Sequence, residues 1–133
     1  MFVSLDSLPT EVSKTRSQWE RELITDTEAI GRLLDCFVFA LVDNPLESKR
    51  VGSILDLVPL PLLGKMIVSL ESNRRADGDW TWPLGGPPLV NYGRGAPALK
   101  DRPPPRKIAE PNEVAAVCNL GELLSANQNK RQI

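Results

Sequence analysis

The stretch SQWERELITDTEAIGRLLDCFVFALVDNP, residues 17–45, decides the fold class of this chain. Its apolar side chains recur three, four or seven positions apart, which is the spacing of one face of an α-helix. Ser17 with Glu20 and Thr25 with Glu28 both match the capping box that begins helices. Either one helix begins at Ser17, or a short helix ends near Thr25 and a longer one begins there; we favour the second. The apolar stripe consists of Trp19, Leu23, Ile30, Leu34, Phe37 and Leu41.

Prolines divide the next apolar segment into two further helices. Pro45 ends the preceding helix because it has no amide hydrogen to donate. Asn44 is a good N-cap and Pro45 a good first helical residue, so we predict a second helix over about 45–58. The PLP sequence at 59–61 then forces a corner, and the spacing of the apolar residues that follow predicts a third helix over about 61–73.

The composition changes abruptly at Asp77. Eight prolines and five glycines occur among the 35 residues 77–111, and no regular helix can run through them. Such a segment prefers polyproline II and turns. Helical spacing returns after Pro111 and predicts a final helix over about 112–126, with NKRQI at 129–133 fraying.

These patterns predict an all-α fold: a small helical bundle with a Pro/Gly-rich irregular arm and a C-terminal helix that docks back or pairs with another chain. A core of this size often needs extra burial, so we also expect self-association as a homo-oligomer. The predicted units are a helical domain at 1–76, an extended arm at 77–111, and the C-terminal helix and tail at 112–133.

Composition and charge narrow the function classes. The chain has 133 residues, of which 41% are hydrophobic and 25% charged, values that fit a globular domain. A net charge of −1 weighs against a duplex nucleic-acid binder, which normally has a basic face. The apolar runs at 36–42 and 54–68 are too short or too interrupted to span a membrane. We expect a soluble protein.

The residue inventory gives little support to catalysis. The chain has no histidine and neither of the glycine-containing sequences GxSxG and GxxxxGK[ST], and the DGD at 77–79 is more typical of a turn than of a carboxylate site. Cys36 and Cys118 each lie in an apolar helical pattern, so we predict two buried thiols in a reducing interior, with a disulfide as the alternative. We therefore expect no metal, no cofactor and no enzymatic activity.

Trp80 and Trp82 open the arm and are two of the three tryptophans. In an extended chain, residues two apart point the same way, so the two indoles would face one surface. One explanation is that they pack the arm onto the helical core. The other is that they form an exposed hot spot for a partner, since Trp, Tyr and Arg concentrate binding energy. The two explanations are compatible.

The arm also carries the residues for a predicted interaction surface. The run KDRPPPRKI at 100–108 is most typical of a solvated basic linker, and the alternatives are a ligand of proline-binding domains and a basic patch for phosphate, RNA or nuclear import. We expect a cytoplasmic protein, with a nuclear location as the alternative. The predicted partner-binding residues are Trp80, Trp82, Tyr92, Arg94, Arg102 and Arg106.

The function predicted from the sequence is that of a non-enzymatic protein–protein interaction module. Its composition would suit a small viral accessory protein that binds a host factor, or a subunit of a larger cellular complex. The alternative is a single-stranded RNA-binding protein in which the aromatic residues of the arm stack on bases and its arginines follow the backbone. The balanced net charge weighs against RNA.

Overall fold

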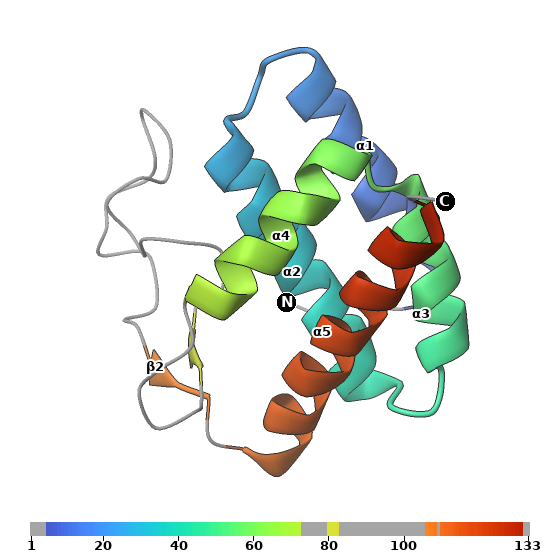
Figure 1. Cartoon of the computed structure of the whole chain (residues 1–133), viewed down its shortest axis with the longest axis vertical. Coiled ribbons are helices and arrows are strands. Elements are labelled where there is room, and N and C mark those ends of the chain that lie inside the picture. Colours follow the sequence, from blue (N-terminus) through green and yellow to red (C-terminus); the bar gives the residue numbers. More distant parts are fainter. Residues whose placement is uncertain (1–4, 73–79, 83–105, 109, 132–133) are drawn as a thin grey trace.

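The structure is a computed structural model, and it describes residues 5–72, 80–82, 106–108 and 110–131. The backbone alone is described for 81, 82, 106 and 107. Within these ranges the all-α prediction is confirmed, with a single pair of two-residue strands beside the helices (Figure 1). The elements are α1 (Leu8–Glu20), α2 (Asp26–Asp43), α3 (Ser48–Ile54), the 3₁₀ turn η1 (Leu55–Leu57), α4 (Leu60–Ser72), β1 (Thr81–Trp82), β2 (Arg106–Lys107) and α5 (Pro111–Arg131).

The predicted break before Thr25 is confirmed. The Thr25 hydroxyl accepts a hydrogen bond from the Glu28 amide, and the Glu28 side chain accepts one from the Thr25 amide, which completes a capping box. α1 begins at Leu8, upstream of the predicted pattern, and Ser17 lies inside it. Glu22, with φ of 59°, lies in the left-handed region just after α1. Leu23 therefore sits in the turn, 62% exposed, and does not belong to the buried stripe as predicted.

The predicted second helix over 45–58 is too long. α2 does end before Pro45, but the Asn44 side chain donates to the Ala40 carbonyl and so satisfies the end of α2. Asn44 is the C-cap of α2, and the N-cap of α3 is Glu47. The corner at 59–61 is confirmed, because Val58 is extended and α4 begins at Leu60.

The final helix is longer than predicted and its end is anchored. α5 continues to Arg131, whose Nη1 donates to the Val58 carbonyl at 2.7 Å. Asn127 is buried and donates to Asp56 Oδ1 at 2.8 Å, and Lys130 pairs with the same carboxylate at 3.1 Å. The prediction that residues 129–131 fray is therefore wrong. The Asp56 carboxylate and the Leu55 carbonyl of η1, together with the Val58 carbonyl, bind the end of α5, and a sequence pattern does not show these distant partners.

α5 docks back onto the bundle. It lies across α2, with α4 on one side and α3 on the other (Figure 1). Its buried residues Val117, Leu120 and Leu124 belong to the same hydrophobic cluster as Phe37 of α2 and Met66 of α4. Residues on both sides of the arm thus build one core.

The two ends of the arm meet beside this core. β1 and β2 pair antiparallel, with Thr81 opposite Lys107 and Trp82 opposite Arg106. The Ile108 amide donates to the Trp80 carbonyl at 2.9 Å, and both of these side chains are buried. The pairing fixes where the chain leaves α4 and where it returns to α5. None of the helices described is long and apolar enough to cross a membrane.

Candidate functional site

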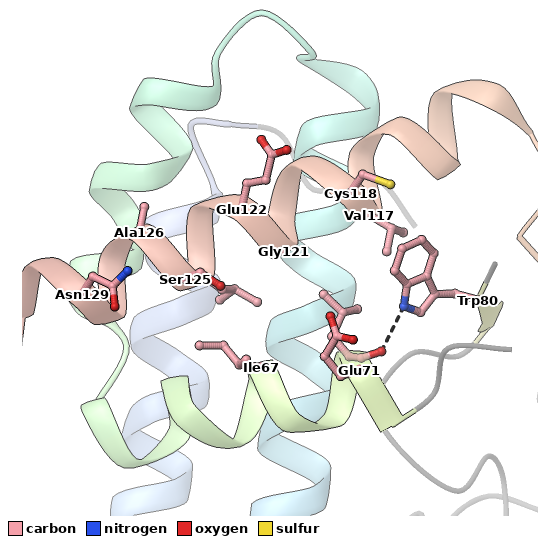
Figure 2. Close-up of a pocket in the computed structure, with 12 residues that line it drawn as sticks. Ile67, Glu71, Trp80, Val117, Cys118, Gly121, Glu122, Ser125, Ala126 and Asn129 are labelled. Atoms are coloured by element: carbon pink, nitrogen blue, oxygen red, sulfur yellow. Dashed lines mark hydrogen bonds between the residues drawn. The ribbon is translucent and has the colours of Figure 1, made fainter. Parts of the chain in front are cut away.

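A groove of about 580 Å³ lies between α4 and α5 (Figure 2). Its floor is apolar, because the two helices meet there through Leu70, Val117 and Leu124, which are buried. Ile67 is only partly buried and extends the apolar surface along α4. Val68, the next residue of α4, is 63% exposed. We name this feature the α4–α5 groove.

Small side chains of α5 keep this groove open. Gly121, Ser125 and Ala126 line it within little more than one turn of helix. A Cβ placed on Gly121 would lie 3.6 Å from Leu70 Cδ2, which is an ordinary van der Waals distance. Larger side chains at these positions would fill the space. Gly121 lies within the final helix predicted over about 112–126, but the sequence does not indicate that it lines a groove.

Trp80 closes one end of the groove, and Asn129 marks the other (Figure 2). The Trp80 side chain is 5% exposed, and its Nε1 donates to the Leu70 carbonyl at 2.9 Å. That carbonyl lies in the last turn of α4, where the helix itself supplies no donor. Trp80 therefore packs the start of the arm onto the end of α4, as the first of the two explanations predicted. Trp80 also lines the groove.

Among the described residues, the charged side chains that line the groove are both acidic. Glu71 of α4 and Glu122 of α5 are exposed at its rim. Neither has a basic partner within the groove lining. An acidic rim over an apolar floor is suited to a cationic, amphipathic occupant.

The two cysteines differ in environment. Cys118 lines the α4–α5 groove and is exposed, so the prediction of a buried thiol is wrong at this position: the face of α5 that carries it is not covered by another described element. Cys36 is partly buried, and desolvation, followed by the charges of Glu11 and Asp35, raises its pKa to about 11. Both cysteines are free thiols.

The predicted partner-binding residues fall into three groups. Trp80 is placed as described above. Trp82 and Arg106 face each other across β1 and β2 in the backbone register, so the structure brings these two positions together. Tyr92, Arg94 and Arg102 lie outside the described residues.

The described part of the chain offers no metal centre: it holds no group of three or more Cys, Asp or Glu side chains placed to share an ion. Of the residues that line the α4–α5 groove, Trp80 was among the predicted site residues and the others were not, because nothing in the sequence indicates that α4 and α5 lie side by side.

The comparisons with known proteins give no relative. No family model matches the chain, and no curated protein or solved structure is similar to it.

Proposed function

We propose that this protein is a non-enzymatic interaction module that receives an amphipathic helix of a partner protein in the α4–α5 groove. The observation that carries the proposal is the combination of an apolar floor with a rim on which the charged residues that the structure describes, Glu71 and Glu122, are both acidic. The partner is a host factor if the chain is a viral accessory protein, or a neighbouring subunit if it belongs to a larger complex.

The apolar floor supplies the binding energy in this proposal. Ile67 lines the groove and is only partly buried, so an occupant would remove apolar surface from water. Burial contributes about 25 cal/mol per Å² before the cost of immobilising the partner. Helices that bind in grooves gain this free energy by burying apolar side chains at positions i, i+3 or i+4, and i+7.

The rim and the small residues select the occupant. Lysine or arginine side chains flanking the apolar face of a helix would meet Glu71 and Glu122. The small side chains of Gly121 and Ser125 let a partner backbone come close to α5. An acidic or extended polar segment would not match either feature.

The test is affinity capture from cells that naturally contain the protein, with the groove altered in one bait. The double variant Glu71→Lys/Glu122→Lys reverses the charge of the rim, and we expect it to lose the partner. The control is Glu22→Lys/Glu47→Lys, which makes the same change at two exposed glutamates outside the groove. Each variant raises the net charge from −1 by four, to +3, so non-specific charge effects are matched.

Retention of one protein by the wild type and the control, together with its loss from the groove variant, would support the proposal. Recovery of the same proteins by all three baits would contradict it. Nuclease treatment separates the RNA alternative, because a partner held only through RNA disappears from every bait.

A second bait tests the apolar floor without a change of charge. In Gly121→Leu the new side chain occupies the groove while the helix gains a better helix former. We expect it to lose the same partner as the charge-reversal variant, whereas Gly121→Ala, with a Cβ at an ordinary distance from Leu70, should retain it.

A further inference from the structure

A second hollow, of about 500 Å³, lies between α1 and α2. α1 contributes Glu11 and Lys14 to its lining, and α2 contributes Asp35, Cys36 and Phe39. It shares no lining residue with the α4–α5 groove. An inference drawn from it is therefore independent of the proposed function.

Asp35 is the unusual residue of this hollow. It is partly buried, and its Oδ1 is enclosed without a hydrogen-bond partner. Buried polar atoms are nearly always paired, because an unpaired one costs about 1–3 kcal/mol or more. Burial raises the pKa of Asp35 to about 7, so without a ligand the carboxyl holds its proton over much of the acidic range.

The protein's own cations do not neutralise Asp35. Arg32 lines the same hollow, but its Nη1 donates to Gln18 Oε1 at 2.6 Å. Lys14 is exposed, and burial is the single cause that shifts the pKa of Asp35, with no compensating contribution from Arg32 or Lys14. The charge that Asp35 carries when ionised thus lacks a counter-charge in the fold.

The thiol of Cys36 lines the same hollow as Glu11, Asp35 and Arg32. Burial is the largest cause of its raised pKa. The negative charges of Glu11 and Asp35 raise the pKa further, and Arg32 lowers it. In the part of the chain that the structure describes, the lining carries two acidic and two basic side chains, but the Asp35 carboxyl forms no ion pair with either basic one, so a positive guest can pair with it when it is ionised.

We propose that the hollow between α1 and α2 binds a primary alkylammonium group, with Asp35 as its anionic partner and Phe39 beside its alkyl chain. An ammonium head is compact and can bind a single carboxylate oxygen. A guanidinium fork fits less well, because it matches both oxygens of a carboxylate and Oδ1 is enclosed. On binding, the proton of Asp35 is released to solvent and the ammonium takes its place as the positive partner.

The test is an NMR titration of the full chain with n-butylammonium chloride at constant ionic strength. We expect saturable shifts of amides in α1 and α2. Because binding displaces a proton from a group with pKa about 7, affinity should rise about twentyfold between about pH 5.5 and about pH 7.5 and then level off. n-Butanol, with the same alkyl length and no charge, should bind at least tenfold more weakly.

Asp35→Asn keeps the shape of the side chain and removes its charge, and we expect it to lose at least tenfold in affinity. The matched control is Asp43→Asn, the same change at an exposed residue of α2 outside the hollow, which should bind like the wild type. Equal affinity of Asp35→Asn and wild type, or no saturable shift in the wild type, would overturn the proposal. If Asp35→Asn does not fold, an affinity of the wild type that is flat across this pH range would overturn it.

The ammonium group can belong to a free amine or to a lysine side chain of another protein. A short peptide with one central lysine, titrated beside its acetyl-lysine counterpart, distinguishes these sources. Tighter binding of the lysine peptide than of n-butylammonium, abolished by acetylation, assigns the site to a protein side chain. Tighter binding of n-butylammonium assigns it to a free amine.

Discussion

At the scale of single residues, Asp35 links the stability of the fold to pH. The folded state favours its neutral form, with a pKa of about 7, whereas the unfolded chain should titrate near the ordinary value of 3.8. Between these two values the folded state binds more protons than the unfolded state, so stability falls as pH rises. The stabilising effect is fully present below 3.8, is lost as pH rises through 7, and does not change further above that.

We therefore expect the free energy of unfolding of the wild type to fall by on the order of 3 kcal/mol between about pH 4 and about pH 8 relative to Asp35→Asn. Urea denaturation of both proteins at several pH values measures the difference. Asp43→Asn, whose carboxyl is exposed, should track the wild type throughout. A difference between wild type and Asp35→Asn that does not vary with pH would show that burial does not shift this carboxyl.

Trp80 is the second residue whose effect can be stated in advance. Trp80→Phe keeps an aromatic ring but leaves the Leu70 carbonyl without its donor, which should cost about 1–2 kcal/mol. Trp80→Ala also removes a buried indole and should cost about 3–5 kcal/mol. Chemical denaturation checks both values, with Leu46→Ala, at a side chain 96% exposed, as the control that changes stability by less than about 0.5 kcal/mol. A Trp80→Ala protein as stable as this control would rule out a structural role for the indole.

At the scale of elements, the stability of the last turn of α5 depends more on the Arg131 side chain than on the helix propensity of its residues. Arg131 donates from Nη1 to the carbonyls of Val58 and Leu55, at 2.7 and 3.4 Å. Charge-assisted hydrogen bonds of this kind are worth about 1.5–3 kcal/mol. In Arg131→Ala we expect the amides of the last turn of α5 to exchange with solvent at least about tenfold faster, as measured by hydrogen exchange.

Lys130→Ala is the control for this experiment. Lys130 pairs with Asp56 across an exposed surface, and such pairs contribute about 0–1 kcal/mol. It should leave exchange in the last turn within a few-fold of the wild type. Equal acceleration in the two variants would mean that loss of charge, and not loss of the bonds to η1, loosens the helix end.

The elements also show what the sequence could and could not predict. Thr25 and Glu28 are three residues apart, and the capping box they predicted is present because both partners are local. Asn44 lies between the end of α2 and the start of α3, and its side chain could cap either helix. The sequence alone did not show that it would donate to the Ala40 carbonyl of α2. The anchoring of Arg131 joins positions more than seventy residues apart, so no local pattern could indicate it.

The candidate site was harder to predict than the fold for the same reason. Trp80 stood out by composition, and its burial follows from where β1 meets α4, which is a tertiary property. Glu71 and Glu122 become neighbours of one groove through the packing of α4 on α5. Asp35 lies in an apolar helical stretch where an exposed carboxylate would be the ordinary expectation, but its Oδ1 is enclosed. Asp35 lines a hollow with residues of α1, a helix whose start the sequence pattern missed.

At the scale of the whole molecule, α5 decides whether the chain unfolds as one unit. It packs against α2, α3, α4 and η1, and it follows the arm in the sequence. A helix that contacts most of the other described elements cannot leave without exposing their core. We therefore expect one cooperative transition, although the arm separates residues 1–76 from 112–133 in the sequence.

Leu120→Ala tests this cooperativity. Leu120 is 0% exposed at the centre of α5, so its truncation should lower the free energy of unfolding by about 2–5 kcal/mol. Trp19, which packs against the core from α1, and Trp80, beside α4 and α5, serve as separate fluorescence probes in single-tryptophan variants. Because the core is shared, both probes and the far-UV circular dichroism should shift to lower urea by the same amount. An early transition at Trp80 with an unchanged one at Trp19 would instead make α5 a separately folding unit, and the α4–α5 groove would then open and close with it.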